Sequence, residues 1–226
     1  MIVLREITKS FGGVQLFRNI GWKAESSEIV GVVGPNGAGK TTLLDIVAGA
    51  QRADAGRVIL DGNDVTRLPP HRRHRLGLAR TFQTPRPFGD MSVYETALLA
   101  GDDAESALRR TRLLDRADEP ASRLRLLDRK RLELARALAS RPKIVLLDEI
   151  AGGLTDAETD SLLELITGLG RDGVTVVWVE HVIRALRPTA TRMICLAEGG
   201  VLAEGSPAEV LSSPAVRAAY LGRAAL

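Results

Sequence analysis

Residues 34–42, with the sequence GPNGAGKTT, have the composition of a phosphate-binding turn. They match G-x-x-x-x-G-K-T and lie between an apolar run, EIVGVV, and a segment with helical spacing. Glycines let backbone N–H groups turn toward phosphate oxygens, the lysine reaches the β- and γ-phosphates, and the next hydroxyl can ligate Mg²⁺. A glycine-rich turn could be only structural, but a Lys-Thr pair after it has no packing reason. The expected nucleotide-binding residues are therefore Gly34, Asn36, Gly37, Ala38, Gly39, Lys40, Thr41 and Thr42.

Two adjacent carboxylates, Asp148 and Glu149, follow the apolar run IVLL. If that run is a buried strand, Asp148 emerges beside the phosphate-binding turn and can hold Mg²⁺, while Glu149 points toward an attacking water. His181 ends another apolar run, VTVVWVEH. Because ligands of parallel sheets bind at the carboxyl ends of the strands, His181 is a candidate contact of the γ-phosphate. The alternatives are an exposed acidic pair and a histidine without a function.

The elements that must position these residues alternate along the chain. Short β-rich runs fill the first sixty residues, and strands alternate with helices after Lys143. Residues 93–139 are rich in Ala, Leu and Arg, with apolar residues three and four apart, which predicts helices. This pattern predicts an α/β fold with a mostly parallel sheet covered by helices.

The composition is that of an ordinary globular protein: 226 residues, 45% hydrophobic, 26% charged, with a formal net charge of +3. This charge is too small to indicate a nucleic-acid partner. No apolar run approaches the ~20 residues that span a bilayer, and the first residues do not have the pattern of a signal peptide. The one cysteine, Cys195, favours a reducing compartment and is expected in a buried strand.

In this order, the motifs resemble the ATP-binding subunit of ABC transporters over nearly the whole chain. Gln83 in ARTFQ matches the family's Q-loop, AGGLTD after Glu149 its D-loop, and His181 its switch histidine. Phe11 in SFGG occupies the place of the aromatic residue that stacks on adenine. The resemblance implies a single domain over residues 1–226, with an α/β P-loop NTPase fold of ABC type. Residues 1–82 and 140–226 would form a RecA-like mixed sheet core with an antiparallel β sub-domain, and residues 83–139 a shortened helical sub-domain with the signature helix.

The resemblance is finer at three segments, SFGGVQLF, PPHRRHRLGLARTFQ and the terminal GSPAEVLSSPAVRAAYLG. These are similar to the ATPases of branched-chain amino acid importers, which also handle related hydrophobic or amide substrates. The basic cluster HRRHR, residues 71–75, belongs to this shared pattern, and we expect it to be a solvated face rather than a nucleic-acid site, since no aromatic residues adjoin it.

The resemblance also implies a mechanism with ATP and Mg²⁺. Glu149, His181, Gln83 and Lys40 would be catalytic, and Thr41, Gln83 and Asp148 would hold Mg²⁺. Two such subunits would close head to tail around two ATP molecules, each held between one subunit's phosphate-binding loop and the other's signature. Transmembrane permease subunits would be direct partners, and an extracytoplasmic solute-binding protein an indirect one. The chain would then lie peripherally on the cytoplasmic face of the membrane.

The signature itself departs from the family pattern L-S-x-G-Q. Anchored on RLELARAL, it falls on residues 124–128, where Arg125 takes the serine position and Leu127 the glycine position. Leu127 adds bulk where a phosphate must approach the backbone. Ile150 stands where the family usually has proline, and the stretch from Gln83 to Arg125 is about twenty residues shorter than in the family, as judged by the resemblance.

In a homodimer this defect would damage both nucleotide sites, but in a heterodimer with an intact partner one site would be complete. Because branched-chain importers pair two different ATPases, the resemblance favours a heterodimer over a homodimer. The alternatives are a paralogue that binds ATP with little or no hydrolysis and a soluble ABC ATPase without a transport role.

Overall fold

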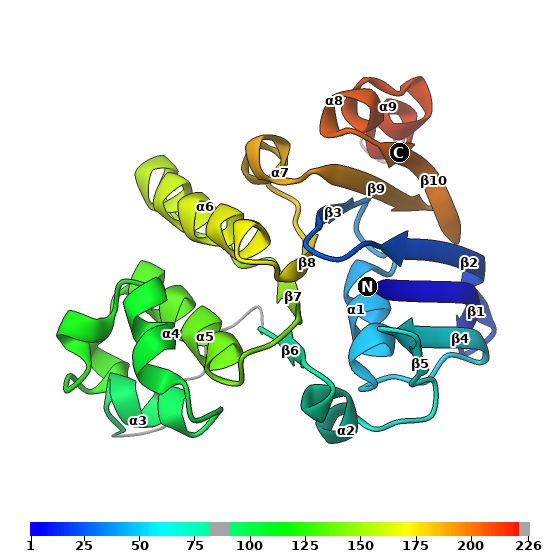
Figure 1. Cartoon of the computed structure of the whole chain (residues 1–226). Coiled ribbons are helices and arrows are strands. Elements are labelled where there is room, and N and C mark those ends of the chain that lie inside the picture. The colour runs from blue at the N-terminus through cyan, green and yellow to red at the C-terminus, as the bar shows by residue number, and fades with distance from the viewer. Residues whose placement is uncertain (82–90, 222–226) are drawn as a thin grey trace.

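A computed structural model describes residues 1–81 and 91–221 of the chain. In this part of the chain, helices cover two β-sheets, and a separate group of helices lies at one side (Figure 1). Gln83, expected in the site, lies outside the described residues.

The larger sheet has the strand order β10-β9-β3-β8-β7-β6. Its neighbouring strands are parallel, except that β10 runs antiparallel to β9. Strands β3, β7 and β8 are buried at every position, as their unbroken apolar sequences predict for a sheet covered on both faces. The strands are β3 (Ile29–Val33), β6 (Leu78–Arg80), β7 (Ile144–Asp148), β8 (Thr175–Val179), β9 (Arg192–Ala197) and β10 (Gly200–Gly205).

The smaller sheet is antiparallel throughout, with the order β2-β1-β4-β5. Strand β1 alternates in part between buried and exposed positions, as expected where one face packs on the core. The strands are β1 (Ile2–Phe11), β2 (Val14–Ala24), β4 (Ala55–Leu60) and β5 (Asn63–Asp64).

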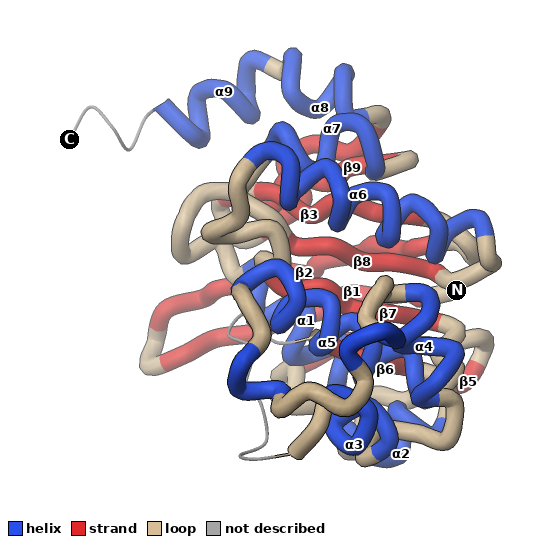
Figure 2. The backbone as a smooth tube through the Cα atoms, turned by 90° about the vertical axis from the view of Figure 1, so that its left-hand side faces the viewer, coloured by secondary structure: helices blue, strands red, loops and turns tan. Residues whose placement is uncertain are grey.

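Helices cover both faces of the larger sheet. On one face α6 and α7 lie over β8 and β3 (Figure 2), and on the other, α1 packs between the two sheets in one continuous apolar cluster. Helices α3, α4 and α5 contact each other and form the group at the side. The helices are α1 (Lys40–Ala48), α2 (Pro70–Arg75), α3 (Val93–Leu98), α4 (Ala104–Arg110), α5 (Leu126–Ala139), α6 (Asp156–Arg171), α7 (Ile183–Thr189), α8 (Pro207–Ser212) and α9 (Pro214–Leu221), with short 3₁₀ turns at Leu114–Arg116 and Ala121–Arg123.

The basic cluster at residues 71–75 corrects one expectation. It forms most of α2, and Arg73 is buried rather than solvated. The Arg73 guanidinium donates to the carbonyl oxygens of Ile46 and Val47, at 2.7 and 2.8 Å, and to those of Leu68 and Thr66. Since the last carbonyls of a helix have no partner within it, Arg73 serves as an external cap for the end of α1.

Within the described ranges, no helix is long and apolar enough to cross a membrane. Cys195 is fully buried in β9, as the sequence predicts.

Candidate functional site

The site residues meet because three neighbouring parallel strands end at the same level. Residues 34–42 follow β3, Asp148 ends β7, and His181 follows β8. The register pairs Asp148 with Val179 and Val32 with Val179, so the three carboxyl ends coincide. The larger sheet therefore brings the turn, the carboxylates and the histidine to one edge, as expected for α/β sheets.

The turn between β3 and α1 requires its glycines. Gly37 and Gly39 have φ angles of 81° and 92°, in the left-handed region that favours glycine. A Cβ atom on Gly39 would lie 2.6 Å from the Phe17 ring, and one on Gly34 would lie 2.2 Å from the carbonyl oxygen of Leu196. The backbone can therefore curl tightly only with glycine at these positions.

Lys40 lies inside this curl. Its side chain is buried, and Nζ donates to the carbonyl oxygens of Gly34 at 2.8 Å and Pro35 at 3.2 Å. Burial lowers the pKa of Lys40, whereas the nearby charges of Glu149 and Asp148 raise it. An ammonium group whose hydrogen bonds within the described chain go to carbonyl oxygens can exchange these partners for phosphate oxygens.

A cavity of about 320 Å³ opens next to the turn. Phe11 stands at its wall, 47% exposed, with Lys9 Nζ 4.9 Å from the ring centroid. A half-exposed aromatic face beside a phosphate-binding turn can stack on a nucleobase. The lining residues are Phe11, Leu16, Asn36, Gly37, Gly39, Lys40, Thr41, Thr42 and Glu149.

Asp148 and Thr41 offer oxygens suited to Mg²⁺. The Thr41 hydroxyl lies 3.5 Å from Asp148 Oδ1, and Asp148 is buried. Burial raises the pKa of Asp148, and the guanidinium of Arg80, 3.1 Å from Oδ2, opposes this. Arg80 also binds Asp45 of α1 at 2.5 Å. A hydroxyl and a carboxylate beside a phosphate-binding turn fit the hard, oxygen-ligated Mg²⁺ ion.

Glu149 turns away from Asp148, as predicted for adjacent carboxylates at a strand end. Its φ angle is 47°, and its N–H donates to the carbonyl oxygen of Val179 at 2.9 Å. Its carboxylate lies at the cavity wall, 3.7 Å from Nδ1 of His181. One carboxylate thus faces Thr41 and the other faces His181.

The sequence analysis did not identify Glu180, which holds the backbone around these groups. Its carboxylate is fully buried and accepts N–H bonds from Ala151 at 2.8 Å, His181 at 3.0 Å and Val182 at 3.2 Å. Glu180 therefore joins the chain after Glu149 to the chain that carries His181. The available signal was an acidic residue at the end of an otherwise apolar run.

The degenerate signature residues stay outside this cavity. Helix α5 begins at Leu126, and Arg125 is exposed at its N-cap, where its side chain makes no capping hydrogen bond among the described residues. Leu126 is 42% exposed, and Leu127 packs partly against the core. Asp128 forms ion pairs with Arg131, at 2.9 Å, and with Arg116. Leucine side chains and an ion-paired carboxylate thus occupy the start of this helix.

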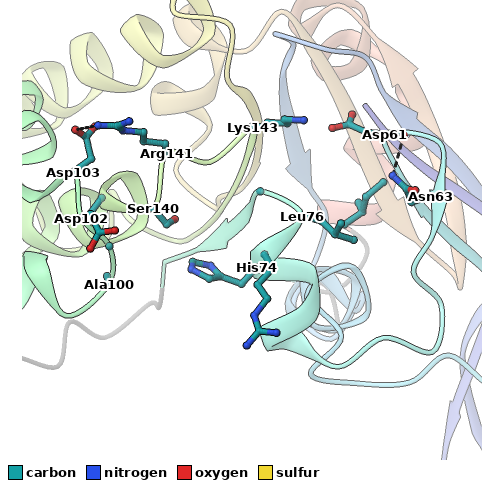
Figure 3. A pocket seen from close by; sticks show the side chains of 15 residues that line it. Asp61, Asn63, His74, Leu76, Ala100, Asp102, Asp103, Ser140, Arg141 and Lys143 are labelled. Atoms are coloured by element: carbon teal, nitrogen blue, oxygen red, sulfur yellow. Dashed lines mark hydrogen bonds and ion pairs between the residues drawn. The ribbon is translucent and has the colours of Figure 1, made fainter.

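A larger groove of about 670 Å³ is not the site (Figure 3). It lies at Gly77 and Lys143, which directly precede β6 and β7, and so at the opposite edge of the sheet from the phosphate-binding turn. Three of its charged residues are in ion pairs: Asp103 binds Arg141 at 2.8 Å, and Asp61 binds the N-terminal amine at 2.5 Å. None of the sequence-predicted site residues that the structure describes lines it.

The fold and the site geometry define a class: a P-loop nucleotide-binding protein with carboxylates at a strand end next to the loop. Family models agree with this class and narrow it. Residues 17–152 match the ABC transporter family, and residues 201–225 match a family described as branched-chain amino acid ATP-binding cassette transporter.

Curated relatives extend the similarity over the whole chain. The high-affinity branched-chain amino acid transport ATP-binding protein BraF of Pseudomonas aeruginosa is 34% identical, and the match covers 96% of each chain. LivG of Salmonella typhimurium, with the same description, is 33% identical and covers 99% of this chain and 98% of its own. The BraF alignment spans 245 positions against 226 residues in this chain, so that relative contains segments that this chain lacks.

Solved structures agree on the fold. A nucleotide-free ATP-binding cassette from an ABC transporter superposes with a TM-score of 0.91 at 25% identity, covering 97% of this chain and 98% of the other. An ADP conformation of an ATP-binding cassette superposes with a TM-score of 0.92 at 26% identity, covering 98% of each. The chain belongs to the ATP-binding subunits of ABC transporters, a family of ATPases that use ATP hydrolysis to drive transport.

Proposed function

We propose that this chain is the ATP-binding subunit of an importer and couples ATP binding and hydrolysis to the uptake of branched-chain or related hydrophobic amino acids or amides. The observation that carries the proposal is the meeting of Lys40 and Glu149 in one cavity, with Asp148 beside it. The substrate class is supported by the names of BraF and LivG and by the family match at residues 201–225.

In the proposed nucleotide site, the adenine base stacks on Phe11, and the N–H groups of residues 37–42 with Lys40 hold the phosphates. Because Lys40 bonds only to backbone oxygens of Gly34 and Pro35 among the described contacts, phosphate oxygens can replace both partners. Thr41 and Asp148 would hold Mg²⁺, which offsets charge on the phosphates when it is bound.

Glu149 is proposed to orient and polarise the attacking water, with His181 as its neighbour at the γ-phosphate. The 3.7 Å separation of His181 Nδ1 and Glu149 Oε2 lets both groups face one small reacting centre. Glu180 would keep the two groups in register through the backbone bonds to Ala151 and His181. Gln83 remains the proposed third contact from the sequence resemblance.

The proposed assembly is a heterodimer with a second, different ATP-binding subunit, docked on transmembrane permease subunits at the cytoplasmic face of the membrane. An extracytoplasmic solute-binding protein would act through those permease subunits. The heterodimer is supported by the two unequal halves of this chain: its phosphate-binding half is complete, whereas Arg125 and Leu127 replace the serine and glycine of the signature.

The test is steady-state ATPase activity and equilibrium ATP binding of the purified chain, compared with Glu149→Gln and Lys40→Ala. We expect ATP binding by the wild type and by Glu149→Gln, and weaker binding by Lys40→Ala, because only the latter loses a phosphate contact. In complex with an intact second subunit, Glu149→Gln should lower turnover roughly 100-fold or more, as for the loss of a general base.

Two results would contradict parts of this proposal. Equal ATP affinity of the wild type and Lys40→Ala would exclude residues 34–42 as the nucleotide site. Bound ATP without Glu149-dependent turnover in the two-subunit complex would favour the alternative, a paralogue that binds but does not hydrolyse ATP.

A further inference from the structure

The C-terminal helices α8 and α9 reach back to the first residue of the phosphate-binding loop. They pack beside β9 and β10 at one end of the larger sheet (Figure 1). From α9, the hydroxyl of Tyr220 accepts a hydrogen bond from the N–H of Gly34 at 2.8 Å, across 186 positions of sequence. This contact joins the segment matched by the second family model directly to the proposed nucleotide site.

Gly34 is where the chain leaves the sheet. Strand β3 ends at Val33, whose ladder partner in β9 is Cys195. Beyond that pair, the Tyr220 hydroxyl takes the acceptor role that a neighbouring strand would otherwise supply. The Gly34 carbonyl accepts from Lys40 Nζ at 2.8 Å, so both backbone polar groups of this residue have side-chain partners.

The position of Gly34 leaves little room for adjustment. A Cβ atom there would lie 2.2 Å from the carbonyl oxygen of Leu196, which places the Gly34 backbone in close contact with β9. If the N–H lost its acceptor, the peptide group could recover a bond only by rotating. Such a rotation would turn the Val33 carbonyl, which belongs to the same peptide unit, and would shift the Gly34 Cα, from which the carbonyl that Lys40 contacts and the rest of the loop continue.

Docking of the C-terminal helices does not itself need the Tyr220 hydroxyl. Val210 of α8 and Val216 of α9 are buried at 1% and 3% exposure, and the Tyr220 ring packs against the same core cluster. Burial raises the pKa of Tyr220, so the hydroxyl stays neutral at physiological pH. The apolar contacts therefore hold α8 and α9 in place, and the Tyr220 hydroxyl is available to bond to the phosphate-binding loop.

We propose that Tyr220 is a positioning residue of the nucleotide site, and that its hydroxyl fixes the Gly34 peptide and thereby the phosphate-binding loop. The C-terminal helices then act as part of the ATP-binding machinery, because their docking sets the shape of the loop in the absence of nucleotide. The proposal rests on the proposed nucleotide site at residues 34–42.

The test compares Tyr220→Phe, which removes only the hydroxyl, with the wild type. Affinity for MgATP is measured by titration with a fluorescent ATP analogue, and exchange of the Gly34 amide proton by NMR or hydrogen-exchange mass spectrometry. We expect about fivefold weaker nucleotide binding, the effect of one hydrogen bond, with faster exchange at Gly34 and urea unfolding that remains cooperative. In the assembled ATPase, KM should rise while kcat stays the same.

Tyr94→Phe is the matched control, because Tyr94 is partly exposed on α3 and should change none of these quantities. Affinity and Gly34 protection in Tyr220→Phe that match the wild type would overturn the proposal. Lys40→Ala separates this outcome from a failure of the proposed nucleotide site. If Lys40→Ala binds ATP like the wild type, the nucleotide site at residues 34–42 is wrong. If Lys40→Ala loses ATP binding, the nucleotide site stands and only the role of Tyr220 fails.

Discussion

The edge of the large sheet that carries Lys40, Asp148 and Glu149 differs in construction from the start of α5, which carries Arg125 and Leu127. At the sheet edge, strand ends fix each group, glycines are required, and the buried Glu180 side chain satisfies backbone groups. At the start of α5, leucines stand partly exposed, and Asp128 pairs with Arg116 and Arg131, whose side chains are 31% and 14% exposed. The first region is preorganised for a ligand, and the second is stabilised as an ordinary helix end.

This difference can be tested by disturbing each region in turn. Buried polar networks are costly to break because a group loses its partner away from water, whereas partly exposed ion pairs are replaced by water at little cost. If the two regions respond alike, the contrast between them is wrong.

The largest expected effect is on stability, at the far end of α1, the helix that begins at Lys40. Arg73→Met should lower the free energy of unfolding by about 3 kcal/mol, because the carbonyls of Ile46 and Val47 at the end of α1 lose a charged donor. Urea unfolding measures this change. Arg72→Met is the matched control on the exposed side of the same helix and should alter stability by less than about 0.5 kcal/mol. Equal losses in the two variants would contradict the capping role of Arg73.

The next largest effect is expected when the family's signature residues are restored at the start of α5. Arg125→Ser combined with Leu127→Gly should raise the ATPase rate of the chain alone roughly tenfold, about 1.4 kcal/mol, since donors that stabilise developing charge are restored. The matched control is Arg125→Ser combined with Leu126→Gly, which introduces a glycine into the same helix one residue before the signature position. This control should not raise the ATPase rate.

A mixing experiment extends this test. The repaired chain carrying Glu149→Gln offers an intact signature without a working site of its own. Mixed with the wild type, it should give more turnover than either protein alone, because the wild-type phosphate-binding half then meets a complete signature. No gain in the mixture would exclude the signature as the defect.

A smaller effect is expected at Glu180. Glu180→Gln keeps an acceptor oxygen but removes the charge that binds the N–H groups of Ala151, His181 and Val182. Turnover should fall about fivefold, near 1 kcal/mol, with ATP affinity unchanged, since none of these groups contacts the phosphate loop. Paired measurements of kcat and ATP affinity check this, and an equal loss of affinity would point to a general disturbance of the fold instead.

The smallest effect is predicted at Asp128. Asp128→Asn should lower the free energy of unfolding by less than about 1 kcal/mol, because both arginines keep another partner. Arg131 retains Ser161 at 2.8 Å, and Arg116 retains Glu119 at 2.6 Å. Thermal unfolding in low and high salt measures this, and a loss comparable to that of Arg73→Met would mean that the start of α5 is as tightly organised as the capped end of α1.

Local sequence patterns predicted much of the fold. The strands over IVGVV, IVLLD and TVVWV and the helix after the phosphate-binding turn are confirmed. These elements are readable because each carries an unbroken apolar run, a glycine C-cap or helical spacing. The bounds of β2 and the strand β10 were not foreseen, because the burial of both strands is only partial and depends on the strands beside them.

By itself, the sequence determined the phosphate-binding turn, the strand-end carboxylates, the α/β class and the altered signature, because these depend on residue type and spacing within short segments. Only the tertiary structure decided which side chains support them from a distance. Arg73 reaches the end of α1, Glu180 joins two loops, and Tyr220 bonds to Gly34 across 186 positions of sequence. These contacts arise from how strands and helices pack. A local pattern of residues cannot show which distant backbone group a buried polar side chain will bond to.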